Sequence, residues 1–149
     1  MVTMRDVRRR LDAEEVDYAE AAELGPDALP HLAELAAGAD TMLASKAVYL
    51  ASVIGGDGSA AIVSAAAGRG DPVLRVAAAA ALRNLAVDDF ERVGETLLDD
   101  EDPGVRKVAI GSVAAADSPA LTARVRRAAE EDPEDYVRDT AARLLPPTQ

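Results

Sequence analysis

A short segment that returns along the chain sets the strongest limit on its fold. Asp71-Pro72-Val73-Leu74-Arg75 comes back with changes as Asp102-Pro103-Gly104-Val105-Arg106, and Asp132-Pro133 begins a third copy. Copies separated by about 30 residues indicate stacked supersecondary units, because one unit of that size cannot bury its apolar face alone. The chain is therefore predicted to be a repeat protein.

Apolar anchor residues keep the same spacing. Leu43, Leu74 and Val105 are 31 residues apart, each followed four residues later by an alanine, and Val137 lies 32 residues further and is followed by Ala141. Residues four apart lie on one face of a helix, so each copy is predicted to begin with a helix. The expected repeat starts lie near Ala13, Asp40, Asp71, Asp102 and Asp132.

A second helix is predicted between successive anchors, because each interval contains another helix-start signal. Small polar residues and proline are common at helix N-termini. Each unit is therefore predicted to be a helix, a short turn and a second helix. The signals are Gly58-Ser59 before residues 60–67, Asp88 with Glu91 around the start of 90–98, and Ser118-Pro119 before 120–129.

The Asp-Pro pair has a local physical role. Aspartate at an N-cap accepts hydrogen bonds from the free amides of the first turn, and proline at the first helical position has its φ already set. Arg75 and Arg106 follow Asp71 and Asp102 by four residues, so they can pair with them on one helix face. Charges that recur at equivalent positions more often join neighbouring repeats than form a site, and we expect that role here.

The ends of the chain depart from the repeat. Two starts that resemble capping boxes, at Thr3 and Asp12, predict helices near residues 4–11 and 13–24. Pro30 fits the first turn of a helix that begins near Asp27.

Near the other end, Pro146-Pro147 cannot continue a helix. The last repeat is therefore predicted to consist of a first helix alone. Its polar residues Arg138, Asp139 and Arg143 suit a terminal unit that covers the exposed core.

Composition supports a helical chain and limits its chemistry. Of the 149 residues, 49% are hydrophobic but only 3% are aromatic, so alanine, leucine and valine dominate and favour closely packed helices in one domain. A net charge of −11 disfavours nucleic acid and anionic membranes. It leaves open a merely solvated surface or one that meets a basic partner. The lack of cysteine excludes disulfides and thiolate chemistry.

The repeat resembles the HEAT-repeat family, and in particular the short bacterial HEAT-like repeats of phycobilisome lyase subunits. Residues 40–50 are a weaker copy, with Ala44 at the arginine position, and two extra residues precede Val137-Arg138. The residues that carry the resemblance are Asp71-Pro72, Leu74-Arg75, Ala78, Ala81-Leu82, Asp102-Pro103, Val105-Arg106 and Ala109.

The resemblance implies an all-α fold, a right-handed α-solenoid of about four antiparallel hairpins plus a capping C-terminal helix, in a single domain over residues 1–149. It places the Asp-Pro helices on the convex side and the second helices along a concave groove. Candidate partner-binding residues on that concave face are the solvent-facing positions of the second helices, namely His31, Glu34, Ser64, Glu91, Glu95, Arg124 and Arg127.

Other motifs fit structural roles better than chemical ones. His31 is the only histidine and cannot form a histidine-based metal site or a Ser/His/Asp set. The acidic runs 99–102 and 130–132 are expected to be solvated loops that also supply helix caps, and residues 55–58 are expected to be a turn because no lysine follows. Gly94 and Gly111 fall inside predicted helices and indicate close helix contacts. Tyr18, Tyr49 and Tyr136 have alanine and leucine neighbours at helical spacing, which favours their partial burial in the core. We predict no catalytic residue, cofactor or metal.

The leading hypothesis is a non-enzymatic scaffold or adaptor that binds a protein partner along the concave face. One alternative is an enzyme-associated subunit of the bilin lyase type, and a less favoured one is a HEAT-like enzyme that handles nucleic acid. The partner is unidentified, and a basic surface would complement the acidic chain. We expect no nucleic acid, membrane span or signal peptide, a cytoplasmic location and a monomer.

Overall fold

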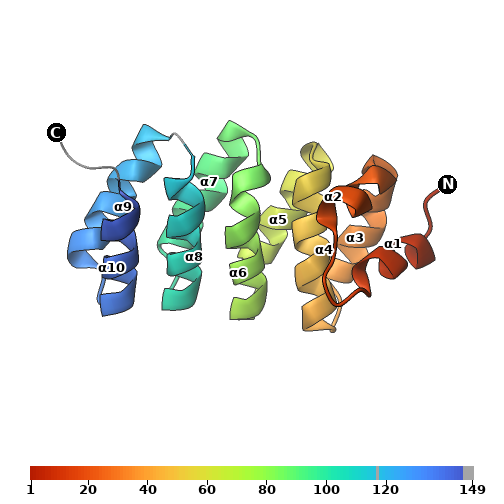
Figure 1. The fold of residues 1–149 in the computed structure, drawn as a ribbon, viewed down its shortest axis with the longest axis horizontal. Helices are drawn as coiled ribbons and strands as arrows, with labels where there is room; N and C mark the ends of the chain where they lie inside the picture. Colours follow the sequence, from red (N-terminus) through yellow and green to blue (C-terminus); the bar gives the residue numbers. More distant parts are fainter. Residues whose placement is uncertain (117, 146–149) are drawn as a thin grey trace.

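A computed structural model describes residues 1–116 and 118–145, which form ten α-helices joined by short turns (Figure 1). α1 (Met4–Leu11) and α2 (Tyr18–Ala21) come first, and three 3-10 turns interrupt the chain at Ala22–Leu24, Pro26–Ala28 and Leu82–Asn84. We call α4 (Thr41–Ile54), α6 (Pro72–Ala81), α8 (Pro103–Ala114) and α10 (Asp135–Leu144) the inner row. We call α3 (Leu29–Ala36), α5 (Asp57–Ala67), α7 (Val87–Leu98) and α9 (Pro119–Glu131) the outer row.

The helices stack as antiparallel hairpins in two rows (Figure 1). Their buried apolar residues form one continuous cluster that runs from Val7 in α1 to Ala141 in α10. Each hairpin therefore completes its core with its neighbours, as repeat units must. The all-α solenoid predicted from the sequence is confirmed.

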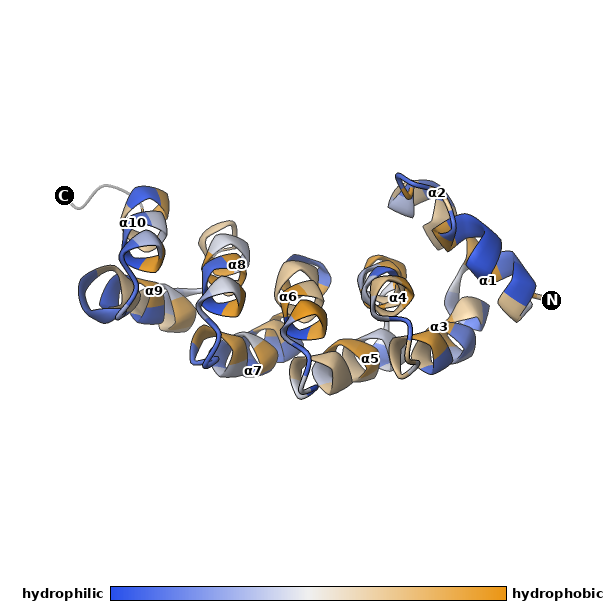
Figure 2. Ribbon diagram, turned by 90° about the horizontal axis from the view of Figure 1, so that it is seen from below, coloured by the Kyte–Doolittle hydropathy of each residue, from blue (hydrophilic) through white to orange (hydrophobic). Residues whose placement is uncertain are grey.

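The two rows curve together, and the inner row lies on the concave side (Figure 2). The prediction that the Asp-Pro helices lie on the convex side is therefore wrong. Neighbouring inner-row helices contact one another more extensively than neighbouring outer-row helices do. Closer packing on one side of a stack bends the stack toward that side, so the solenoid curves toward the inner row.

Five of the ten α-helices in the described residues, namely α1, α2, α4, α6 and α8, begin with a side-chain cap. Thr3 and Asp6 form the predicted capping box of α1, and the Asp71 carboxylate accepts from the Val73 amide at 2.9 Å. The second start differs, because residues 12–15 form bends and the N-cap of α2 is Asp17. The helix expected near residues 13–24 is thus shortened to α2 and the 3-10 turn that follows.

Arg75 and Arg106 join neighbouring repeats. Arg75 binds Asp100 through two hydrogen bonds of 2.8 and 3.2 Å, and Arg106 binds Asp132 through bonds of 2.8 and 3.0 Å. The predicted linking role is confirmed. Pairing on the same helix face is not observed, because each arginine reaches the loop before the next inner-row helix. Hydrogen bonding to these carboxylates raises the pKa of both arginines against the opposing effect of burial.

Asp132 does not cap α10, which corrects the predicted repeat start. Its carboxylate accepts from Arg106 and from the Glu134 amide, and the N-cap of α10 is Glu134. Asp100 occupies the same role, since it binds Arg75 and accepts from the Asp102 amide. The structural counterpart of Asp102 is therefore Glu134, which accounts for the two extra residues in the last copy.

Candidate partner-binding surface

The predicted partner-binding residues lie on the outer row, on the convex side (Figure 2). His31 on α3 is half-buried, and its Nε2 lies 3.1 Å from the Val2 carbonyl oxygen. The His31 side chain therefore packs against the N-terminal segment. Glu34 is exposed on the same helix. Ser64 on α5 accepts a hydrogen bond of 3.3 Å from Arg92. Among the described residues, no hydrogen bond or ion pair joins these three residues to the other four.

The remaining four residues meet between α7 and α9, where much of their polarity is used within the protein. Arg124 forms an ion pair with Glu95 at 3.4 Å and a second with Asp99, and hydrogen bonding to Asp99 raises the pKa of Arg124. Glu91 accepts from the Ser118 hydroxyl at 3.4 Å. Arg127 lines the adjacent hollow. The space between the two repeats is therefore a polar hollow, which Arg124 also lines.

The concave surface, which the prediction assigned to the outer row, is formed by the inner row. It is more apolar than the charged cluster between α7 and α9. Its central helix α6 carries one charged side chain, Arg75, which is buried. Val73 on this helix is 46% exposed, and Val76, Ala77 and Ala80 are partly exposed. The signal was present, because a helix that is apolar all round has more apolar surface than one core face can bury.

Residues that correspond to Val73 in other inner-row helices extend this surface. Met42 in α4 and Tyr136 in α10 stand, like Val73, two residues after the N-cap, and they are 66% and 44% exposed. Burial of Tyr136 was expected and is not observed. Gly104 takes this position in α8. We call Met42, Val73, Val76, Ala77, Ala80 and Tyr136 the concave apolar surface.

Lysines and tyrosines lie to either side of α6. Lys46 on α4 donates to the carbonyl oxygens of Leu11 and Ala13 at 3.0 and 3.2 Å. Lys107 on α8 lies 5.9 Å from the centre of the Tyr136 ring, a distance suited to a cation–π contact. The lysine contacts thus join α4 to the end of α1 and the segment after it, and α8 to α10, on either side of the concave apolar surface.

Tyr18 on α2 packs edge-to-face on Tyr49 of α4, with ring centres 4.8 Å apart. Burial, with a smaller contribution from Tyr49, raises the pKa of Tyr18. Partial burial of these two tyrosines agrees with the sequence expectation. The contact fixes α2 against the N-terminal end of the inner row.

Within residues 1–116 and 118–145, no group of three or more His, Cys, Asp or Glu side chains is placed to hold a metal ion. The acidic run 99–102 is instead engaged by arginines from both sides, through Arg75 and Arg124. No helix in the described part of the chain is both long and apolar enough to cross a membrane. The features that distinguish the surface are therefore shape and apolarity.

Curved stacks of helical hairpins define the α-solenoid class of repeat proteins. The family model for HEAT repeats matches residues 59–146, more than half of the chain, and the chain belongs to this family. No curated protein matches the sequence.

Two solved structures share the fold. One is a chain of the complex of CpcE and CpcF of phycocyanin lyase from Nostoc sp. PCC7120, with a TM-score of 0.70 and 18% identity over 95% of this chain and 99% of that chain. The other is human deoxyhypusine hydroxylase in complex with glycerol, with a TM-score of 0.67 and 17% identity over 95% of this chain. This chain spans 60% of the length of the hydroxylase chain.

Proposed function

We propose that the protein is a non-enzymatic interaction module that binds a partner protein on its concave apolar surface. The observation that carries the proposal is the outward face of α6, which is apolar and lies at the centre of the concave side. Apolar side chains exposed at a concave surface favour protein contacts, because a partner can remove them from water together. The six outer-row residues other than His31 remain candidates for a second, polar contact with the partner.

The similar chain from phycocyanin lyase was solved in a complex of two proteins, which supports a protein as the partner. The same similarity favours one alternative, in which the module is a subunit of an enzyme assembly. Its fold is similar over nearly the full length of that chain. A pigment that copurifies with the protein and absorbs visible light would favour this alternative.

Affinity capture with purified protein tests the proposal. We expect the wild-type chain to capture one protein in stoichiometric amount, and the double variant Val73→Glu/Ala77→Glu to lose it. Two buried carboxylates at an interface weaken binding by roughly 100-fold or more, because their desolvation is uncompensated. Val73 is exposed and Ala77 is partly exposed, so the helical circular-dichroism signal should be unchanged.

The matched control reverses the outer-row charges at Glu91, Glu95, Arg124 and Arg127. On our proposal this variant affects binding less than the α6 variant does. Loss of the partner from the outer-row variant, with full retention by the α6 variant, would place the interface on the convex side and contradict the proposal. The proposal would also be contradicted if the wild-type chain captured no protein in stoichiometric amount.

A further inference from the structure

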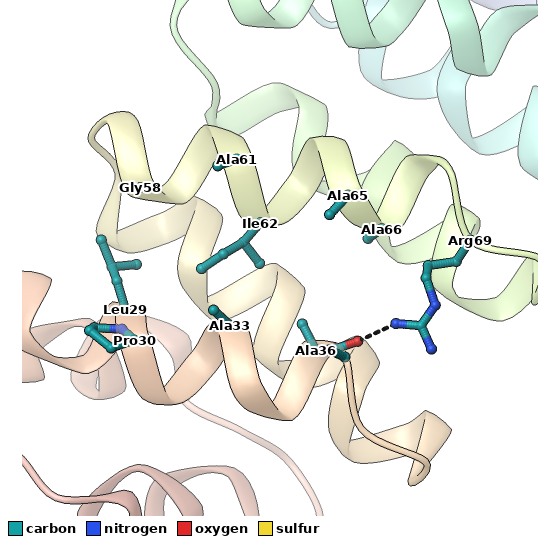
Figure 3. Close-up of a pocket in the computed structure, with 11 residues that line it drawn as sticks. Leu29, Pro30, Ala33, Ala36, Gly58, Ala61, Ile62, Ala65, Ala66 and Arg69 are labelled. Atoms are coloured by element: carbon teal, nitrogen blue, oxygen red, sulfur yellow. Dashed lines mark hydrogen bonds between the residues drawn. The ribbon is translucent and has the colours of Figure 1, made fainter.

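The convex side contains an open apolar groove between α3 and α5, with a volume of about 400 Å³ (Figure 3). Its walls include Leu29 and Ala33 from α3 and Ala61, Ile62 and Ala65 from α5. The only ionisable side chain that lines it is Arg69, at the end of α5. The groove lies on the opposite side of the molecule from the concave apolar surface.

The groove is larger and more apolar than the equivalent hollow between α7 and α9, of about 280 Å³, because the charged side chains that line that hollow are missing. Between α7 and α9, Arg124 reaches Glu95 and Asp99. The residues 62 positions earlier are Ile62, Ala33 and Ala37. Apolar side chains thus stand in the groove at the positions of all three charged residues that form the ion pairs between α7 and α9.

The neighbouring pair of outer-row helices shows the same contrast. Between α5 and α7, Arg92 extends to Ser64. The residues 31 positions before these two are Ala61 and Ala33. The alanines of the α3/α5 groove are therefore not a general feature of the repeat.

Arg69 provides the groove with an available cation. Its Nη1 donates to the Ala36 carbonyl oxygen at 2.8 Å, and among the described residues it has no carboxylate partner within ion-pair distance. The residue 31 positions later is Asp100, which binds Arg75. Ala44 stands 31 positions before Arg75, so the repeat that contains the groove has lost both members of this ion pair and gained a guanidinium.

We infer that the α3/α5 groove docks an amphipathic helix of a partner protein, with apolar side chains in the groove and a carboxylate on Arg69. Alanine walls let a third helix approach closely. The eight residues of α3 give a groove of about 12 Å, or two helical turns. Two apolar side chains four residues apart fill that length, and an acidic residue one turn further reaches the guanidinium. The inference concerns a second surface and does not depend on partner binding at α6.

A displayed library of amphipathic helices tests this inference, with peptides of about 16 residues, long enough to hold a helix in water. We expect selection on the wild-type protein to enrich two apolar residues four apart followed by an acidic residue. Arg69→Glu should weaken the selected peptide about tenfold, and a peptide with lysine in place of the acidic residue should bind Arg69→Glu more tightly than wild type.

Ala61→Arg should block both peptides, because it places in the groove the residue that α7 carries as Arg92. Ala123→Arg, at the equivalent exposed position of α9, is the matched control and should bind like wild type. Equal binding to the wild-type and Ala61→Arg proteins, or no enriched peptide, overturns the inference. Binding of a fluorescent fatty acid in the groove, when no peptide is selected, would assign the groove to a free amphiphile. That result would also overturn the inference.

Discussion

The N-terminal and C-terminal parts of this solenoid share one backbone plan but differ in how their repeats are joined. From α6 onward, Arg75 and Arg106 each cross to the next loop and bind a nearly buried carboxylate. Among the described residues, no ion pair joins the α3–α4 hairpin to the α5–α6 hairpin. Apolar packing and neutral or singly charged hydrogen bonds suffice there. The comparison shows that hairpins of this fold stack both with and without charged links between them.

The largest effect is expected from breaking a link in the C-terminal part. Asp132→Asn leaves Arg106 without its carboxylate at a site where the two side chains are 12% and 5% exposed. Loss of one partner of such a buried pair costs about 3 kcal/mol of unfolding free energy, measurable by urea denaturation. Asp71→Asn is the control, because asparagine caps a helix as well as aspartate does. Equal, small losses in both variants would contradict the assigned role of Asp132.

Acid should weaken the C-terminal part selectively. Burial alone would raise the pKa of Asp132, but hydrogen bonds from Arg106 and the Glu134 amide and the charges of Arg106 and Arg138 outweigh it and lower that pKa. A pKa lowered by folding means that the ionised form stabilises the native state above the unfolded value of about 3.9. That stabilisation is lost as the pH falls through the lower folded-state pKa.

Hydrogen exchange measured through this acidic range should therefore show α8–α10 losing protection before α4. In Asp132→Asn the pH dependence of the C-terminal part should be reduced. Simultaneous loss of protection in both parts of the wild-type protein would show that the two parts are not separately linked.

A smaller effect distinguishes the packed outer row from the open concave side. A Cβ added at Gly94 would lie 3.0 Å from Leu121 Cδ1, whereas one added at Gly111 would meet no atom within 4 Å. The close helix contact predicted from the sequence is thus confirmed for Gly94 and wrong for Gly111. We expect Gly111→Ala to stabilise the protein by about 0.5–1 kcal/mol.

Gly94→Ala should instead destabilise by about 1 kcal/mol, because overpacking exceeds the gain in helix propensity. Thermal denaturation of the two variants provides the measurement. Stabilisation by both substitutions would show that the Leu121 side chain moves aside freely. The close contact of α7 with α9 would then not restrict the side chain at position 94.

Local sequence signals were sufficient for the repeat and for the capped inner-row helices α4, α6 and α8, because caps and apolar spacing act over a few residues. They did not place the start of α7, whose N-cap is Ala86 and which has no side-chain cap. Long-range consequences were not accessible in the same way. The partner of Arg75 lies 25 residues away in the next loop, beyond any pattern on its own helix. Curvature arises from the packing of all the helices together, and the family resemblance assigned the concave side to the wrong row.

The α3/α5 groove illustrates the same limit. Each alanine in it is ordinary for a helix, and only comparison with positions 31 and 62 residues later shows what is missing. That comparison needs the register of the outer row, which the structure supplies through the contacts of Arg92 and Arg124.

The uneven placement of the arginine links also has a mechanical consequence. Under a force that pulls the two ends apart, each Arg–Asp link must be sheared before its repeats separate. The joint between the hairpin of α3 and α4 and the hairpin of α5 and α6 has no such link among the described residues. The solenoid should therefore extend stepwise, and the joint that contains the α3/α5 groove should separate without the shearing of an Arg–Asp link. A helix bound in that groove would add contacts across this joint.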